Sequence, residues 1–125
     1  MTTTAQETCW RVRRLPDGTV AAGVEPLGWD PRAAVPEDEV VVRVEAAGFN
    51  YKDALCCAGH PGVMRTAPLV PGIDVAGTLL APVAGLPAGA EIVVTGHGLG
   101  ERRNGGFATH VRAPADAVIQ RPAGL

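Results

Sequence analysis

The polar cluster best suited to proton transfer in this sequence is Asn50-Tyr51-Lys52-Asp53. Asn50 is a favoured helix N-cap, and an acidic residue three positions later suits the positive end of a helix. One interpretation is therefore structural: a capped helix start with ordinary solvated charges. The other is functional, because a phenol or an ammonium group on the first helical turn, at the lip of a cleft, could donate a proton or stabilise an enolate.

A glycine-rich segment, Gly96-His97-Gly98-Leu99-Gly100, raises the question of a phosphate-binding turn. A dinucleotide fingerprint has the pattern G-x-G-x-x-G and opens a helix whose N-terminal amides meet the pyrophosphate. Here Glu101 stands in place of the last glycine, and the residues that follow, up to Gly106, cannot propagate a helix. We interpret the segment as a mobile surface loop, which could still border a ligand.

Residues that could bind a metal or act as nucleophiles are few: His60, His97, His110, Cys9, Cys56 and Cys57. The histidines lack mutual helical spacing, and no cysteine or carboxylate recurs beside them, so we predict no zinc site. The cysteines are odd in number and form no C-x-x-C pair, which disfavours a disulfide framework or a zinc ribbon. Cys56 and Cys57 are interpreted as half-buried helix packing, because a nucleophile needs a base that the sequence does not place.

Short strands and one short helix would position these groups. Apolar and polar residues alternate in Glu39–Ala46, where Val40, Val42 and Val44 share one face. High glycine and proline contents, 16 and 11 residues, favour short strands and turns over long helices. The expected elements are a hairpin of Cys9–Arg13 and Thr19–Val24 around Pro16-Asp17-Gly18, a strand Glu39–Ala46, a helix of about two turns within Asn50–Gly59, and strands Ile73–Leu80, Glu91–Val94, Gly106–Arg112 and Asp116–Gln120.

Length and composition indicate a single globular domain spanning residues 1–125. The chain is 46% hydrophobic and 19% charged, with a net charge of −2, so no nucleic acid or anionic membrane is expected as a partner. No apolar run approaches the ~18 residues that cross a bilayer, and Met1–Glu7 does not resemble a signal peptide. We therefore expect a cytoplasmic protein. Six or so strands with one short helix predict a mostly β fold, a partly open barrel or sandwich. The sequence shows no alternation of strands and helices in βαβ order, so we expect no Rossmann half within these residues.

Three ordered segments resemble a known family. Phe49–Leu55 and Pro68–Thr78 look like the N-terminal half of the medium-chain dehydrogenase/reductases. Val94–Glu101, followed by Gly105–Ala108, resembles the acrylyl-CoA reductase type of quinone oxidoreductase within that superfamily. The resemblance covers essentially the whole chain. It implies a GroES-like domain, a partly open barrel with one or two short helices, which family members follow with a Rossmann cofactor domain.

The resemblance further implies the zinc-free branch of this superfamily. Zinc alcohol dehydrogenases place a cysteine ligand where this chain has Asn50. Their G-H-E motif supplies a histidine where this chain has Ile73, with Asp74 in the glutamate position. Neither an amide nor a hydrocarbon side chain suits zinc, and the four-cysteine structural lobe is missing. We therefore expect no metal.

In the zinc-free branch, a hydride passes from NADPH to the β-carbon of an activated alkene, a 2-enoyl-CoA or a quinone-like enone. Charge then develops on the carbonyl oxygen, and donors aimed there lower the barrier. The resemblance assigns catalysis to Tyr51 or Lys52, with Tyr51 favoured as the acid. It places Asn50 and Thr95 at the cofactor, and Asp53, Ile73, Asp74 and His97 along the substrate cleft.

The expected partners are a Rossmann cofactor domain, in cis or in trans, and a small enoyl-CoA or quinone. NADPH affinity in the family rests mainly on that second domain, so the chain alone is expected to have little or no reductase activity. The alternative hypothesis is a free-standing GroES-like module that serves in binding or interaction and is catalytically inactive without a cofactor domain.

Overall fold

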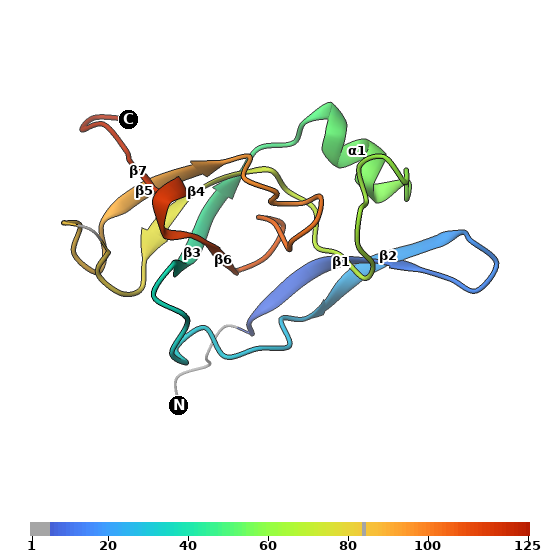
Figure 1. Ribbon diagram of the computed structural model, residues 1–125, viewed down its shortest axis with the longest axis horizontal. Helices are drawn as coiled ribbons and strands as arrows, with labels where there is room; N and C mark the ends of the chain where they lie inside the picture. The colour runs from blue at the N-terminus through green and yellow to red at the C-terminus, as the bar shows by residue number, and fades with distance from the viewer. Residues whose placement is uncertain (1–5, 84) are drawn as a thin grey trace.

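The computed structural model describes residues 6–83 and 85–125, and the expectation for Met1–Glu7 therefore lies largely outside the described residues. Two β-sheets and one short α-helix make up the fold (Figure 1). In chain order the elements are β1 Thr8–Arg14, β2 Val20–Pro26, β3 Glu39–Ala47, α1 Tyr51–Cys57, β4 Asp74–Leu79, β5 Glu91–Thr95, β6 His110–Pro114, the 3-10 helix η1 Ala115–Ala117, and β7 Ile119–Gln120.

Strands β1 and β2 form the predicted antiparallel hairpin, which extends to the right of the molecule in Figure 1. At its turn the Asp17 carboxylate accepts from the backbone N–H of Thr19 at 3.0 Å, which is the local bond that favours aspartate in turns. Helix α1 covers the hairpin, because its buried Cys56 belongs to the same apolar cluster as Val12 of β1 and Leu69 of the following loop. The helix is therefore held by tertiary packing, as a helix of only two turns must be.

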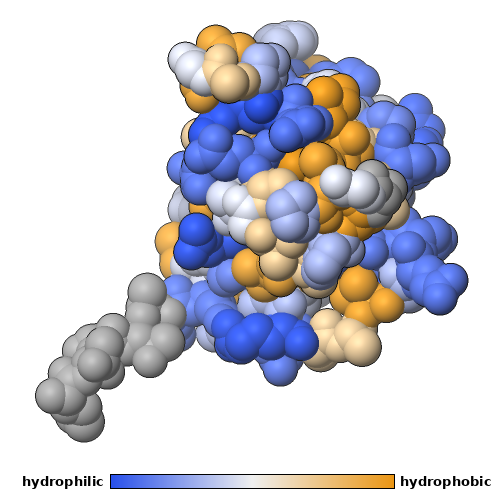
Figure 2. All heavy atoms as spheres, turned by 90° about the vertical axis from the view of Figure 1, so that its left-hand side faces the viewer, coloured by the Kyte–Doolittle hydropathy of each residue, from blue (hydrophilic) through white to orange (hydrophobic). Residues whose placement is uncertain are grey.

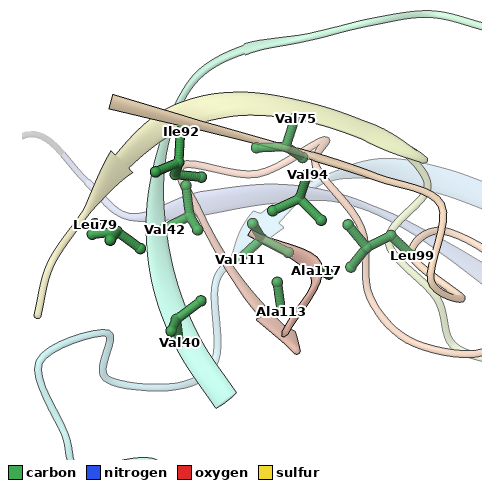
Figure 3. Packing of buried hydrophobic residues seen from close by; sticks show 10 residues of the cluster. All are labelled: Val40, Val42, Val75, Leu79, Ile92, Val94, Leu99, Val111, Ala113 and Ala117. Carbon is green, nitrogen blue, oxygen red and sulfur yellow. The ribbon is translucent and has the colours of Figure 1, made fainter. Parts of the chain in front are cut away.

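The remaining five strands form an antiparallel sheet in the order β6-β3-β4-β5-β7. Val40 and Val42 of β3 point into its apolar core, whereas Arg43 and Glu45 are exposed, as their alternation predicts. Figure 3 shows how side chains from four strands converge with Leu99 of the glycine-rich segment and Ala117 of η1. The core thus includes Ile92 and Val94 of β5, and Leu99 anchors the loop that follows this strand in it.

The fold-class prediction is confirmed: strands dominate, one α-helix is present, and the sheets of the described part of the chain form no closed barrel. The end of the five-stranded sheet faces the viewer in Figure 2, where hydrophobic atoms reach the surface between hydrophilic flanks. Val83 and Leu86, in the connection between β4 and β5, are partly buried against the core. No helix among the described residues has the length and hydrophobicity that crossing a membrane requires.

Two sequence predictions of strands are wrong in their bounds. The strand expected at Gly106–Arg112 begins only at His110, because the amides of residues 105–107 donate to the carbonyls of Val70, Gly72 and Pro71 in a loop. The strand expected at Asp116–Gln120 is shortened to Ile119–Gln120 and preceded by η1. In the first place, contacts with a loop distant in sequence take the hydrogen bonds that a longer strand would have used. In the second, the backbone forms a turn of 3-10 helix, and the N–H of Val118 donates to the nearby carbonyl of Ala115.

The loop around Gly72 and the loop before β6 cross at very short range. A Cβ atom placed on Gly105 would lie 2.0 Å from the carbonyl oxygen of Gly72, a separation that no side chain tolerates. The crossing connects the segment after α1 to the segment that leads into β6. It therefore fixes the start of β4, where the candidate site lies.

Candidate functional site

Three of the predicted site residues, Asn50, Asp74 and Thr95, form one hydrogen-bonded group. The Asn50 side-chain amide donates from Nδ2 to Asp74 Oδ2 at 2.9 Å, and the Thr95 hydroxyl donates to Asp74 Oδ1. The antiparallel register pairs Asp74, the first residue of β4, directly with Thr95, the last residue of β5. Asn50 reaches them as the N-cap of α1. The group thus joins three elements at one end of the sheet.

Asp53 lies just behind this group and is completely buried. Its Oδ2 accepts from the backbone N–H of Asn50 at 2.7 Å, and its Oδ1 accepts from the backbone N–H of Gly72 at 3.1 Å. The first bond is the contribution that the third helical residue makes to a capping box. The second ties the start of the helix to the loop crossing. The structure therefore places Asp53 in the interior, and a role in a substrate cleft stays a prediction.

The two candidate acids have different surroundings. Lys52 Nζ lies 2.7 Å from Glu101 Oε1, in an ion pair that links α1 to the glycine-rich segment. Tyr51 is 79% exposed, and its hydroxyl makes no hydrogen bond to the described residues. Tyr51 thus presents an exposed phenol on the first turn of α1, whereas the ammonium group of Lys52 already has a partner.

A shallow groove of about 480 Å³ runs along the Asp74–Thr95 pair. Gly48 and the small side chains of Ala46, Ala47 and Ala76 form much of its floor and walls, with Val75 and Val93. Beside it Phe49, 70% exposed, stacks on Phe107 with ring centroids 5.8 Å apart and planes at 8°. The groove therefore combines small apolar residues with the carboxylate of Asp74 and the hydroxyl of Thr95, and the amide of Asn50 bonds to that carboxylate.

Ile73 and His97 flank the site without joining its hydrogen bonds. The Ile73 carbonyl accepts from the backbone N–H of Gly96 at 2.9 Å, which holds the glycine-rich segment to the start of β4. His97 is exposed and has a positive φ of 55°. No helix follows this segment, in agreement with its interpretation as a loop. The side chain of Leu99 is buried, however, so the segment is anchored more firmly than a loop whose side chains all lie at the surface.

The described residues contain no group of three histidine, cysteine or acidic side chains that could hold a metal ion. His60 Nδ1 accepts from the backbone N–H of Gly62, and His110 lies beside Thr109, so neither faces the groove. Asn50 donates to Asp74, and the side chain of Ile73 offers only hydrocarbon, so neither presents a thiolate or an imidazole to a metal ion.

The adjacent cysteines are packing residues. Cys56 is fully buried rather than half-buried, and burial raises the pKa of its thiol to about 11. Cys57 is half-buried, and burial also raises the pKa of its thiol. Because the thiolate is the reactive form, neither group is poised as a nucleophile at neutral pH.

Glu101 and Phe107 are the residues near the site that sequence reasoning missed. Glu101 pairs with Lys52 across 49 positions of sequence, and Phe107 stacks on Phe49 from the loop before β6. Neither contact leaves a local signal in the sequence. Only the resemblance of the segments around them could have indicated that these residues lie close to the helix.

Comparisons with known proteins agree on one family of domains. Residues 36–123 match the model of the alcohol dehydrogenase GroES-like domain. The probable acrylyl-CoA reductase AcuI of Escherichia coli K12 is 38% identical over 110 residues, which cover 87% of this chain and 33% of that protein. The putative quinone oxidoreductase YhfP of Bacillus subtilis is 34% identical over 92 residues, which cover 73% of this chain and 28% of that protein.

A solved structure adds the cofactor of a relative. The yhdH oxidoreductase of Salmonella enterica, in complex with NADP, matches with a TM-score of 0.81 and 36% identity, over 94% of this chain and 36% of that chain. This chain spans about a third of the length of the relatives it matches.

Proposed function

The chain belongs to the family of alcohol dehydrogenase GroES-like domains, and on that premise we propose that it is the catalytic-domain portion of an NADPH-dependent reductase of activated alkenes. The substrate class is a 2-enoyl-CoA, such as acrylyl-CoA, or a quinone-like enone. The relatives named acrylyl-CoA reductase and quinone oxidoreductase support this class. The family model matches residues 36–123, and the extension of the domain to residues 1–125 stays a prediction.

The observation that carries the proposal is the hydrogen-bonded group of Asn50, Asp74 and Thr95 at the groove. Both oxygens of Asp74 accept a hydrogen bond, so the carboxylate orients the amide and the hydroxyl rather than acting as a base. Oriented amide and hydroxyl groups beside an apolar surface suit the carboxamide and flat ring of a nicotinamide. Asn50 and Thr95 are therefore the proposed cofactor contacts.

The described residues fit one end of NADPH and not the other. The groove is long and open, with small residues along it, and accommodates a flat ring. Its lining contains no basic side chain, and the glycine-rich segment opens no helix that could bind a pyrophosphate. The remaining contacts must then come from a Rossmann cofactor domain, in cis or in trans. The exposed Phe49 and Tyr51 provide apolar surface for such a domain to cover.

When bound, NADPH supplies a hydride to the β-carbon of the alkene. As the carbonyl oxygen of the substrate gains negative charge, a hydroxyl donor beside it stabilises that charge, and a proton completes the reduction. Tyr51 is the proposed acid because its phenol is free to donate. Lys52 is the second candidate, and its pairing with Glu101 gives it a role in holding α1 against the glycine-rich segment.

We propose that this reaction needs no metal ion at the site. The support is the donor set: Asn50, Ile73 and Asp74 stand at the positions of zinc ligands, and Asp74 already accepts hydrogen bonds at both oxygens. Ile73, Asp74 and His97 are the proposed borders of the substrate cleft. Asp74 lines the groove, and the carbonyl of Ile73 accepts from the N–H of Gly96 in the glycine-rich segment that contains His97. The buried Asp53 accepts from the N–H of Gly72, next to Ile73.

A chimera tests the proposal, in which this chain replaces the corresponding third of the E. coli relative. We expect oxidation of NADPH that depends on acrylyl-CoA. Tyr51→Phe should lower kcat by about a hundredfold, the lower end of what a positioned acid contributes. Lys52→Met should have a smaller effect. Glu37→Gln, at an exposed loop position outside the groove, is the control and should keep the activity of the unmodified chimera.

The opposite result has a clear meaning. A folded chimera that binds NADPH but reduces neither acrylyl-CoA nor a quinone would contradict the proposal. It would favour the alternative of a GroES-like interaction module. Equal activity of the Tyr51→Phe and unmodified chimeras would remove Tyr51 from the role of acid and leave Lys52 as the candidate.

A further inference from the structure

A second pocket, of about 330 Å³, shares no lining residue with the groove at Asp74. It lies where the hairpin meets the five-stranded sheet, and its lining comes from β1, β3, β6 and the loops that follow β2 and precede β6. Three arginines and one glutamate line it, together with several apolar side chains. The charged residues are Arg11, Arg103, Arg112 and Glu39.

The charges of this pocket do not balance. Glu39 accepts from Arg103 at one carboxylate oxygen, at 3.1 Å, and from Arg112 at the other, at 2.7 Å. One negative charge therefore serves two positive ones. Arg11 pairs with Glu25, which lies 3.0 Å away, does not line the pocket and also pairs with Arg13. The wall around Glu39 thus keeps one uncompensated positive charge, in a chain whose net charge is −2.

Unused hydrogen-bond donors accompany this charge. A guanidinium group has five N–H donors, and among the described residues only Nη2 of Arg103 and of Arg112 donates to a partner. Arg112 Nε is buried without a partner. The Asn104 side chain accepts at Oδ1 from the backbone N–H of Val70, which leaves its amino group available. An anion between these side chains would satisfy donors that the protein leaves open.

Apart from His110, the rest of the lining is apolar, and it includes the indole ring of Trp29. Leu27 and Val70 are buried, and the half-buried Trp29 packs against the same cluster. A ligand that fills the pocket would therefore need an apolar body as well as a negative charge. A carboxylate can accept two parallel hydrogen bonds from the fork of a guanidinium group. Its single negative charge also matches the one positive charge that Glu39 leaves unbalanced.

We propose that this pocket binds a small organic monocarboxylate with a flat apolar body, of the benzoate class. The carboxylate lies between Arg103 and Arg112, and the apolar body lies against Trp29 and Leu27. This site is independent of the proposed reductase function, because neither the groove nor the helix start contributes to it.

The test is a titration of the ¹⁵N-labelled protein with sodium benzoate, followed through the indole N–H of Trp29 and the backbone amides of β6. Neutral benzamide, which has almost the same shape, is the matched ligand control. We expect saturable shifts with benzoate and an affinity for benzamide that is about tenfold lower, since hydrogen bonds to charged groups are the stronger ones. Equal affinities, or benzoate shifts that never saturate, would overturn the proposal.

Arginine variants test which side chains bind the carboxylate of benzoate. Arg112→Gln should weaken benzoate binding about tenfold. Arg121→Gln is the matched control, because Arg121 also pairs with glutamates and also has a buried, unpartnered Nε but lies outside the pocket. If Arg112→Gln does not fold, Arg103→Gln takes its place. A folded pocket variant with unchanged benzoate affinity, or tighter binding of inorganic phosphate than of benzoate, would contradict the assignment.

Discussion

Asp74 holds the candidate site together. It receives hydrogen bonds from the N-cap of a helix and from the end of a neighbouring strand, so three elements depend on one carboxylate. The bond from Nδ2 also determines which end of the Asn50 amide faces Asp74 and which faces away. A side-chain amide held in this way is an oriented group, which is what recognition of a planar ring requires.

The buried carboxylate of Asp53 gives a prediction on stability. Asp53→Asn keeps the size of the side chain but replaces one of its two accepting oxygens with an amino group, opposite a backbone N–H of Asn50 or Gly72. We expect the free energy of unfolding to fall by about 2 kcal/mol, the usual cost of an unsatisfied buried group. Urea denaturation measures it. The exposed Asp116→Asn should change the value by less than about 0.5 kcal/mol, and equal effects of the two would refute this role of Asp53.

At the residue scale, contacts between residues close in sequence could be predicted, and contacts between residues far apart in sequence could not. The cap at Asn50 and the acidic residue at Asp53 lie three positions apart, and their relation follows from helix geometry alone. The pair of Lys52 and Glu101 spans 49 positions and left no local pattern. The family resemblance implied a place at the cofactor for Asn50 and Thr95 and one along the substrate cleft for Asp74. The register of β4 and β5 supplies the physical reason for the contact of Asp74 with Thr95.

Among the elements, β3 and β4 pair so that no side chain fits at Gly77. The pairing of β3 with β4 shifts between Val44 and Ala46, which is a β-bulge, and Gly77 pairs with Val44 at its edge. A Cβ atom on Gly77 would lie 2.1 Å from the carbonyl oxygen of Arg43. The absence of a side chain at Gly77 is thus a condition for the pairing of two central strands.

Gly77→Ala should therefore destabilise the protein by about 3 kcal/mol, the upper part of the usual cost of overpacking. Gly23→Ala in β2 is the matched control, because a Cβ atom placed on Gly23 would have no other atom within 4 Å and its φ is not positive. The control should be neutral or slightly stabilising, since alanine restricts the unfolded chain. Thermal unfolding of both variants measures the difference, and similar melting temperatures would contradict the close approach.

The hairpin gives a prediction on pH dependence. Hydrogen bonds from Arg13 and Arg11 lower the pKa of Glu25 from its ordinary 4.5 to about 2. Because the folded pKa is the lower one, the stabilisation by Glu25 is present above pH 4.5 and is lost as the pH falls towards 2. Melting temperatures of Glu25→Gln and the unmodified protein should therefore differ at about pH 6 and converge towards about pH 2, as an order-of-magnitude expectation of this linkage.

Glu37→Gln, which also removes one surface carboxylate, serves as the control for net charge in this experiment. A constant difference between Glu25→Gln and the unmodified protein across the acid range would show that the ion pairs do not form. The partners Arg13 and Arg11 come from β1 and Glu25 from β2, so the same experiment tests the register of the hairpin.

The bounds of strands were predicted well where an alternating segment pairs within a sheet, and less well where part of the segment bonds to a loop. Glu39–Ala46 was found within one residue of its expected bounds, because valines on one face of β3 meet a core. Gly106–Arg112 also alternates, but its first residues bond to the loop at Pro71 and Gly72, and the strand begins at His110. Alternation reports which side of a segment is buried, and it does not say whether a strand or a loop provides the partner.

For the molecule as a whole, the chain spans about a third of the relatives it matches, and in the proposed function its groove meets only the nicotinamide end of the cofactor. We therefore expect the 125-residue chain alone to bind NADPH no more tightly than about 1 mM, because the pyrophosphate and adenosine contacts of this family lie in the Rossmann domain. It should also oxidise NADPH with acrylyl-CoA at no more than a trace rate.

A fluorescence titration of NADPH measures this affinity, and addition of the cofactor domain of the E. coli relative is the matched comparison. Saturable binding at micromolar NADPH by the chain alone would contradict the expectation, as would steady turnover of acrylyl-CoA. Binding that appears only with the added domain would agree with a catalytic portion that works in trans.

The crossing of the loops at Gly72 and Gly105 has a consequence for protein engineering. Because these backbones touch, a mutagenesis library that randomises either position would consist mostly of clones that cannot close the end of the sheet. The exposed positions beside the groove, Phe49 and Tyr51 among them, carry no such restriction of space. Selection for new substrates should therefore leave the glycine junction untouched and concentrate its diversity at the rim.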